Sequence, residues 1–202
     1  MNLTLSRRTS PKDVCCRKHL FLFSFPHKCA IKGQGKESHD FRERHMIPEK
    51  VKSVLDAHNL RAVEFEEGST STAKAAAEKL GVIVGQIAKS LLLIGKNGLF
   101  YLILCPGDRK ISSSKLKSVI GVKSRMANAE ETFQATGFHP GGVCPFGVEG
   151  VHILLDESLK QYVTIYPAAG NSASGVPMTF NQLLDITDGQ VCDCTVPMVM
   201  NE

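Results

Sequence analysis

The sequence predicts a single domain of the mixed α/β class. Short amphipathic and apolar segments alternate along the chain, and two apolar runs flank a turn sequence typical of a β-hairpin. The segments show no repeated β-α-β spacing, which argues against a doubly wound parallel sheet. With 202 residues, 43% of them hydrophobic, the chain can form one domain of ordinary size with an extension.

The first 45 residues differ in composition from the rest. They contain ten Lys or Arg and four Asp or Glu, whereas residues 46–202 contain fourteen and sixteen. No helical or strand period persists in residues 1–45, so we expect a basic, disordered extension that cannot bury enough apolar surface to offset its ordering entropy. The folded domain is expected over residues 46–202. Translation that starts upstream of Met46 is an alternative origin of the extension.

Capping signals place the helices. Pro48 suits a first helical position, Ser71 can cap a helix that Gly81 closes, and Asn128 and Thr179 each have a Glu or Gln three residues later, as in a capping box. Met178, which precedes Thr179, can pack against Leu183 as a hydrophobic staple at the start of the last helix. The expected helices are residues 48–59, 71–80, a segment from 112–114 to 120, 128–137 and one starting at 179.

Apolar runs place the strands. Residues 89–94 and 99–105 flank the turn Gly95-Lys96-Asn97-Gly98, which predicts a hairpin. The further expected strands are residues 151–155, 162–166 and 191–196.

Composition excludes several classes of protein. No apolar run approaches the roughly 18 residues that cross a bilayer, so we expect a soluble protein without a membrane partner. Seven cysteines without a clear secretory signal predict reduced thiols and a cytoplasmic location. Their spacing matches no common zinc pattern, and we expect neither metal nor cofactor. Cys192 and Cys194 could chelate a metal, but burial in the core is the favoured interpretation.

Lys89 is the first candidate for chemistry, because it enters an apolar strand. A lysine in that position must reach water, find an anionic partner, or meet a ligand carbonyl or phosphate in a pocket. The alternative is an edge lysine whose ammonium reaches solvent.

The second candidate is the glycine-rich loop, residues 141–147. Its glycines and prolines predict a tight loop whose backbone amides could approach a ligand, as in an oxyanion cradle. An ordinary structural turn is the alternative. Cys144 lies in this loop near His139 and His152, so a thiol nucleophile is also considered, although no third orienting group is evident.

A basic stretch is the third candidate. Between residues 109 and 129 the sequence has no acidic residue, which makes the stretch a candidate contact for a polyanion backbone. An ordinary solvated helix is the alternative. The stretch contains Arg109, Lys110, Lys115, Lys117, Lys123 and Arg125.

Several spaced motifs, in order from Met46 to the C-terminus, resemble the YbaK/ProX family of aminoacyl-tRNA deacylases, trans-editing factors related to the editing domain of bacterial prolyl-tRNA synthetase. The motifs are Ser71-Thr72-Ala73 with Ala76-Ala77, Leu80-Gly81-Val82, residues 86–91, Pro106-Gly107-Asp108, Thr136-Gly137-Phe138, the glycine-rich loop, Asp156-Glu157 and Ala169-Gly170.

The resemblance implies a curved, mixed and mostly antiparallel sheet surrounded by helices, and hydrolysis of the ester between a small, wrongly attached amino acid and the terminal adenosine of tRNA. It implies catalytic roles for Lys89, Gly141, Gly142 and Asp156, with Lys89 contacting the aminoacyl carbonyl or the terminal phosphate. The implied substrate-binding residues are Ser71, Thr72, Ser90, Val143, Cys144, Pro145, Phe146, Gly147, Ala169, Gly170 and Asn171.

Two positions depart from the family pattern. Cys144 stands where many relatives have Ser or Pro, which argues against a required thiol. Asn171 stands where relatives often have His, so a role of that His in choosing the amino acid is in doubt.

An aminoacyl ester is already activated, so a site that positions water beside amide donors needs no nucleophile of its own. We therefore expect a trans-acting deacylase for Ala, Cys, Ser or Thr on a mismatched tRNA, with tRNA as partner and an aminoacyl-tRNA synthetase as a second candidate partner. A non-catalytic module that binds tRNA or a synthetase is the competing hypothesis.

Overall fold

A computed structural model describes residues 47–66, 70 and 72–198, all of which belong to one compact unit, Gly35–Glu202. The expected basic extension, residues 1–45, lies outside the described residues. Within them, no helix is long and apolar enough to cross a bilayer.

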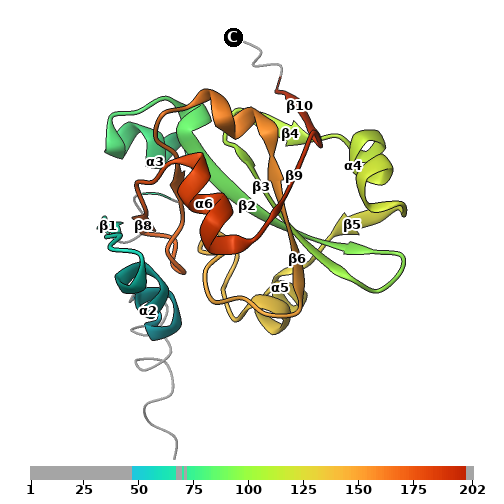
Figure 1. Cartoon of the computed structure of the whole chain (residues 1–202), viewed down its shortest axis with the longest axis horizontal. Helices are drawn as coiled ribbons and strands as arrows, with labels where there is room; N and C mark the ends of the chain where they lie inside the picture. The colour runs from blue at the N-terminus through green and yellow to red at the C-terminus, as the bar shows by residue number, and fades with distance from the viewer. Residues whose placement is uncertain (1–46, 67–69, 71, 199–202) are drawn as a thin grey trace, which may run out of the picture. The chain divides into compact units, whose positions relative to one another are not determined.

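A six-stranded mixed sheet forms the centre of the domain (Figure 1). Its main path runs β5 (Ser124–Met126), β2 (Ile87–Gly95), β3 (Phe100–Pro106), β6 (Val151–Asp156) and β9 (Gln190–Cys192), and β7 (Tyr166–Pro167) also pairs with β2. The predicted hairpin is confirmed as β2 and β3, in which Lys89 lies opposite Cys105. Gly98 in the turn has φ +79, a conformation that favours glycine.

Two short sheets complete the strands. β1 (Val63–Glu64) pairs with β8 (Ser174–Gly175), and β4 (Arg109–Ile111) pairs with β10 (Thr195–Pro197). Among the described residues, four strand pairings are antiparallel and three are parallel, and all three parallel ones lie in the main sheet. The mixed architecture is confirmed. The main sheet has two antiparallel and three parallel pairings, so the expected antiparallel majority is present only when the two small sheets are counted.

Two predicted strands differ from the structure. Residues 191–196 divide into β9 and β10, because the chain leaves the main sheet at Asp193 to pair with β4. Residues 162–166 are mostly not a strand: they follow the 3-10 helix η2 (Glu157–Gln161), and only Tyr166 joins the sheet.

Five helices lie in the described part of the chain: α2 (Glu49–Ala57), α3 (Ala73–Leu80), α4 (Ser113–Ile120), α5 (Ala129–Thr136) and α6 (Phe180–Thr187). Both predicted capping boxes are present, at Asn128 and Thr179. Pro48 is the N-cap of α2 rather than its first residue, and the described N-cap of α3 is Thr72, since Ser71 lies outside the described residues. Gly81 closes α3 in the left-handed conformation, as predicted.

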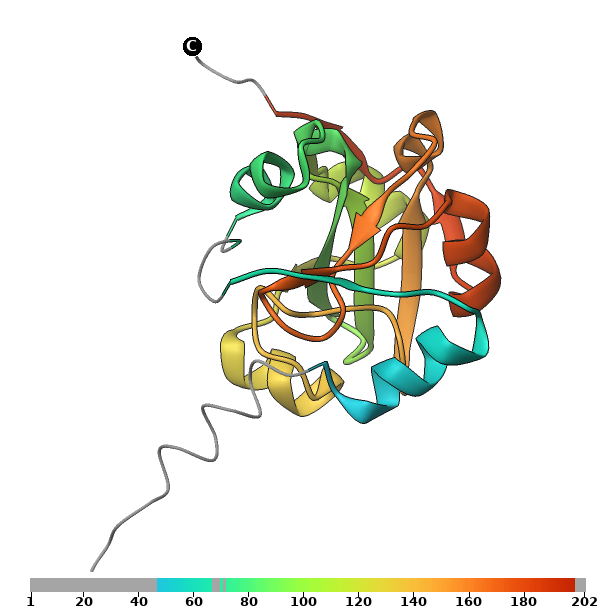
Figure 2. The same cartoon turned by 90° about the vertical axis from the view of Figure 1, so that its left-hand side faces the viewer.

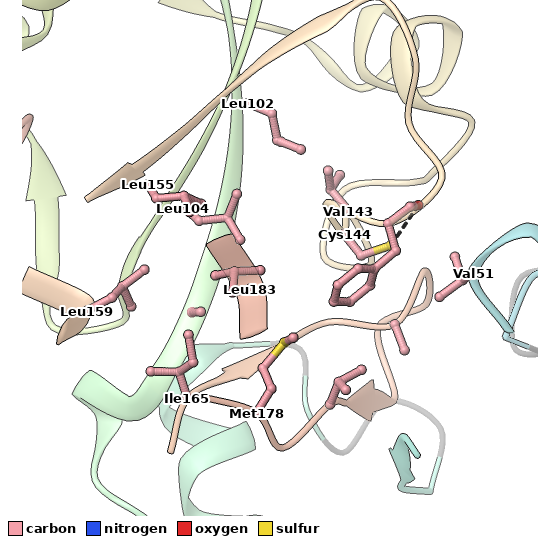
Figure 3. Close-up of a cluster of buried hydrophobic side chains, with 14 of the residues drawn as sticks. Val51, Leu102, Leu104, Val143, Cys144, Leu155, Leu159, Ile165, Met178 and Leu183 are labelled. Carbon is pink, nitrogen blue, oxygen red and sulfur yellow. Dashed lines mark hydrogen bonds between the residues drawn. The ribbon is translucent and has the colours of Figure 1, made fainter. Parts of the chain in front are cut away.

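Buried side chains form two clusters, one on each face of the main sheet. The larger joins alternate residues of β2 and β3 to α2, α6 and the glycine-rich loop, and Figure 3 shows Leu104, Leu155, Cys144 and Leu183 in it. In Figure 2, α2 and α6 lie next to each other. The smaller cluster packs Leu116 of α4 against the other face. Both faces of the sheet are buried. Residues of β2 can therefore reach a ligand only at the edge of β2 that faces away from β3.

Candidate active site

A break in strand pairing defines the site. On the edge of β2 that faces away from β3, residues 87–88 pair with β7 and residues 93–95 pair with β5. The described strands leave residues 89–92 unpaired on that edge, apart from the Leu92 carbonyl, which accepts from the Ala127 amide at 3.0 Å. A pocket of about 220 Å³ opens at this interval, and Lys89, Ser90 and Leu91 line it.

Segments far apart in the sequence build the pocket wall. Helix α3 contributes the small side chains of Ala73 and Ala76, and Gly141 and Val143 come from the glycine-rich loop. Thr70 donates a hydrogen bond to the Ser172 carbonyl, which connects the segment before α3 to the segment before β8. The remaining lining residues are Thr72, Leu80, Ile87, Ala88, Tyr166, Ala168, Ser174 and Gly175.

Lys89 is held at the pocket by two backbone carbonyls. Its Nζ donates to Gly107 O at 3.4 Å, in the turn that joins β3 to β4, and to Arg109 O, at the start of β4. A lysine ammonium has three donors, so one remains for a ligand. Lys89 is therefore anchored beside the pocket rather than extended into solvent.

Ser90 contributes an unpartnered polar atom. Its Oγ is buried and has no hydrogen-bond partner within the described part of the chain, although it belongs to a pocket-lining residue. A buried polar group without a partner costs free energy, so a ligand polar group at this position would be stabilised.

The glycine-rich loop reaches the pocket through Gly141, which has φ +92. The amide of Gly142 donates to His139 O at 3.0 Å and is thus engaged in the turn. A Cβ on Gly142 would lie 2.6 Å from Asn171 Cα, so the backbones of the two loops are in close contact. Gly142 shapes the site, whereas Gly141 lines it.

Residues 144–146 lie behind the pocket. Cys144, Pro145 and Phe146 are buried, and none of them lines the pocket. Burial raises the pKa of the Cys144 thiol to about 12, which keeps it protonated at neutral pH. His139 stacks on Phe133, and His152 stacks on Tyr101. The buried, protonated thiol argues against Cys144 as a nucleophile.

The predicted residues 147 and 169–171 also lie outside the pocket lining. Asn171 Oδ1 accepts hydrogen bonds from the Ala173 amide at 3.0 Å and from Ser174 Oγ at 2.6 Å, so it fixes the loop that provides Ser172 and Ser174. Ala169 is buried, and a Cβ on Gly170 would collide with Pro48. These residues support the pocket from behind.

Asp156 is buried and lies outside the pocket lining. Its carboxylate accepts from the Ser158 amide at 3.1 Å and the Cys194 amide at 3.1 Å. Burial raises the pKa of Asp156, but hydrogen bonds from Ser158 and the Cys194 amide outweigh that effect and hold the pKa below its usual value. Asp156 joins the start of η2 to the segment between β9 and β10.

The six residues of the basic stretch divide into two groups. Arg109 Nε donates to Thr195, Lys115 Nζ lies 2.7 Å from the Asp193 carboxylate, and Arg125 pairs with Glu131 at 2.6 Å. Lys110, Lys117 and Lys123 are exposed, and the described residues offer them no ion pair. Lys115 and Arg125 have acidic partners and the Arg109 side chain is held by Thr195, which leaves the second group as the members of the stretch whose side chains are most available to a polyanion.

The described residues contain no group of three or more His, Cys, Asp or Glu side chains placed to hold a metal ion. Cys192 and Cys194 are both buried, as the favoured interpretation expects. Several lining residues were not predicted from the sequence, among them Thr70, Tyr166, Ser172 and Ser174. No local motif marks them, because they face the pocket only after distant segments fold together.

Comparison with known proteins defines the class. Residues 67–186 match the family model described as the aminoacyl-tRNA editing domain. YwhH of Bacillus subtilis, which has no described function, is 39% identical over 63% of this chain and 82% of its own length. EbsC of Enterococcus faecalis, a proposed Cys-tRNA(Pro)/Cys-tRNA(Cys) deacylase, is 28% identical over 70% of this chain and 90% of its own.

A proline–tRNA ligase of Pseudothermotoga lettingae is 36% identical over 55% of this chain, which spans only 18% of the ligase. A crystal structure of a proposed trans-editing enzyme for prolyl tRNA synthetase superposes with a TM-score of 0.68 at 36% identity, covering 73% of this chain and 96% of that one. The chain belongs to the aminoacyl-tRNA editing domain family, whose members are deacylases that hydrolyse the ester bond of mischarged tRNA.

Proposed function

We propose that this protein releases a small amino acid from mischarged tRNA in trans, with Lys89 and Gly141 acting at the ester. The observation that carries the proposal is that both residues line one pocket of about 220 Å³ at the unpaired edge of β2. Ligand pockets for drug-sized molecules measure roughly 300–1,000 Å³, so this one suits an amino acid side chain and its ester rather than a whole nucleotide.

The third donor of the Lys89 ammonium would contact the aminoacyl carbonyl or the terminal phosphate. Water oxygen bonds to the carbonyl carbon, the ester carbon–oxygen bond breaks, and the ribose oxygen takes up a proton. Free amino acid and uncharged tRNA result. A fixed positive charge beside the carbonyl stabilises the negative charge that develops on its oxygen, without reorganisation during the reaction.

Small residues in the wall support selection by size. Ala73, Ala76 and Gly141 leave room for Ala, Cys, Ser or Thr, and an added methylene is worth about 1–3 kcal/mol of discrimination. The match with this chain covers 90% of EbsC and 96% of the trans-editing enzyme structure. Because the similarity extends over nearly the whole of these separate proteins, it supports action in trans. A cytoplasmic location, where aminoacyl-tRNA is used in translation, and a synthetase as partner belong to the same proposal.

The test is deacylation of tRNAs charged with Ala, Cys, Ser, Thr and Pro by wild type and Lys89→Ala. We expect selective release of a mismatched small amino acid and a loss of about 10²–10³-fold in Lys89→Ala. A fall in kcat indicates contact with the carbonyl, and a rise in KM indicates contact with the phosphate. Lys52→Ala, which removes an exposed lysine of α2, is the matched control.

Circular dichroism of Lys89→Ala checks that the fold is intact. Full activity in this variant would remove the role assigned to Lys89. If the wild type releases none of the amino acids but still binds tRNA, the non-catalytic binding module becomes the better account.

A further inference from the structure

Phe133 and His139 form an exposed aromatic pair. Their ring centroids lie 4.7 Å apart with an interplanar angle of 22°, so the rings are stacked. Phe133, on α5, remains 47% exposed although His139 covers one face of its ring. The pair therefore presents aromatic surface to solvent.

This pair lies close to the pocket. His139 precedes the lining residue Gly141 by two positions, and two residues of chain span at most about 7 Å. The carbonyl of His139 accepts the Gly142 amide at 3.0 Å, and the capping box of Asn128 and Glu131 fixes the start of α5. Both rings are thus carried by elements with defined positions relative to the glycine-rich loop.

The substrate has a part that the pocket does not accommodate. With an amino acid and its ester in about 220 Å³, we expect the terminal base, which is joined to that ester through the ribose, to lie outside on the adjacent surface. Unpaired bases bind proteins by stacking on aromatic rings, an interaction that tolerates any base because every base has a π-face.

We propose that Phe133 and His139 form a stacking platform for the unpaired terminal base at the 3′ end of tRNA. The inference rests on the proposed function and adds the surface that holds the base. Base stacking here strengthens binding of the nucleic acid, while Lys89 and Gly141 act on the ester.

The first experiment compares Phe133→Leu, which keeps an apolar side chain without a π-face, with Phe133→Tyr, which keeps the face. We measure deacylation of the mischarged tRNA that the wild type hydrolyses fastest. Phe133→Leu should raise KM about tenfold with kcat unchanged, and Phe133→Tyr should restore the wild-type KM. Val163→Ala, at an 87% exposed position, is the control for loss of surface hydrophobicity.

A second measurement uses uncharged tRNA with 2-aminopurine in place of the terminal adenine. Stacking should quench its fluorescence on wild type and Phe133→Tyr, with the quenching lost on Phe133→Leu. If the wild type deacylates tRNA while Phe133→Leu keeps its KM and its quenching, the stacking platform is wrong and the proposed function stands. If the wild type deacylates no tRNA, the proposed function fails and this inference fails with it.

Discussion

Arg109 Nε donates a hydrogen bond to the hydroxyl of Thr195 at 2.7 Å, and this contact ties β4 to β10 at the turn that holds Lys89. The carbonyl oxygen of the same Arg109 accepts a hydrogen bond from the Lys89 ammonium. Arg109 is one of the predicted tRNA-binding residues, and its side chain contacts the buried Thr195. The position of Lys89 thus depends on a strand that lies about a hundred residues later in the chain.

Thr195→Val removes the hydroxyl and keeps the shape of the side chain. We expect a loss of about 1 kcal/mol in the free energy of unfolding. We also expect kcat to fall by about tenfold, because small displacements of a catalytic group reduce the rate strongly. KM should not change, since Thr195 does not line the pocket.

Thr187→Val is the matched control for this prediction, because it removes a hydroxyl that donates to Leu183 O at 2.7 Å in α6. It should lower the free energy of unfolding by a similar amount and leave kcat unchanged. Equal kcat values for Thr195→Val and wild type would show that β10 does not position Lys89.

The exposed lysines should account for the electrostatic part of tRNA binding. Combined replacement of Lys110, Lys117 and Lys123 by Gln should weaken binding and reduce the slope of log Kd against log salt by about 2, because each phosphate contact contributes roughly 0.7–0.9. Filter binding at several salt concentrations measures the slope.

Lys115→Gln provides the comparison within α4, since Lys115 already pairs with Asp193 at 2.7 Å. It should change the slope less than Lys117→Gln does. Identical slopes for the triple variant and wild type would show that these lysines are only solvated surface.

Asp156→Asn should lower the stability of the fold rather than the rate of deacylation. Hydrogen bonds to a charged group contribute about 1.5–3 kcal/mol, so we expect a loss of about 2 kcal/mol at pH 7. Because the folded-state pKa of Asp156 is lowered, its stabilisation is present above the unfolded pKa of about 3.9 and is lost as pH falls through the folded-state pKa.

Urea unfolding of both proteins between pH 3 and pH 7 tests this sign. The difference in the free energy of unfolding between wild type and Asp156→Asn should shrink toward acid pH. The kcat of Asp156→Asn at 25 °C should be close to that of wild type. A large fall in kcat with unchanged stability would assign Asp156 to the catalytic machinery instead.

Gly142→Ala should disturb the site through backbone contact. The new Cβ would lie 2.6 Å from Asn171 Cα and 2.7 Å from Asn171 C, so one of the two loops must move. We expect reduced thermal stability and a reduced rate of deacylation. Gly150→Ala is the control: Gly150 has φ +71 but no neighbour within 4 Å, so only backbone strain is added. Equal deacylation by Gly142→Ala and Gly150→Ala would show that the loop contact does not shape the site.

Local signals in the sequence predicted much of the fold. The turn at residues 95–98 predicted the β2–β3 hairpin, and Asn128 with Glu131 predicted the start of α5, because each structure is formed by residues adjacent in the chain. Residues 162–166 were wrongly predicted to be a strand along their whole length. A β-rich composition does not by itself supply pairing partners, and only the end of the segment pairs, Ile165 with Met178 and Tyr166 with Ile87.

Local sequence signals were enough to predict the five helices, the β2–β3 hairpin and β6, and the spaced motifs were enough to predict the family and to name Lys89 and Gly141, which the structure brings to one pocket. The unpaired interval of β2 became evident only once the chain was folded. The same holds for the contacts of Asp156 with Ser158 and Cys194 and for the ion pairs of the basic side chains. Burial and pairing depend on segments distant in sequence, whereas turns and caps depend on neighbours within a few residues.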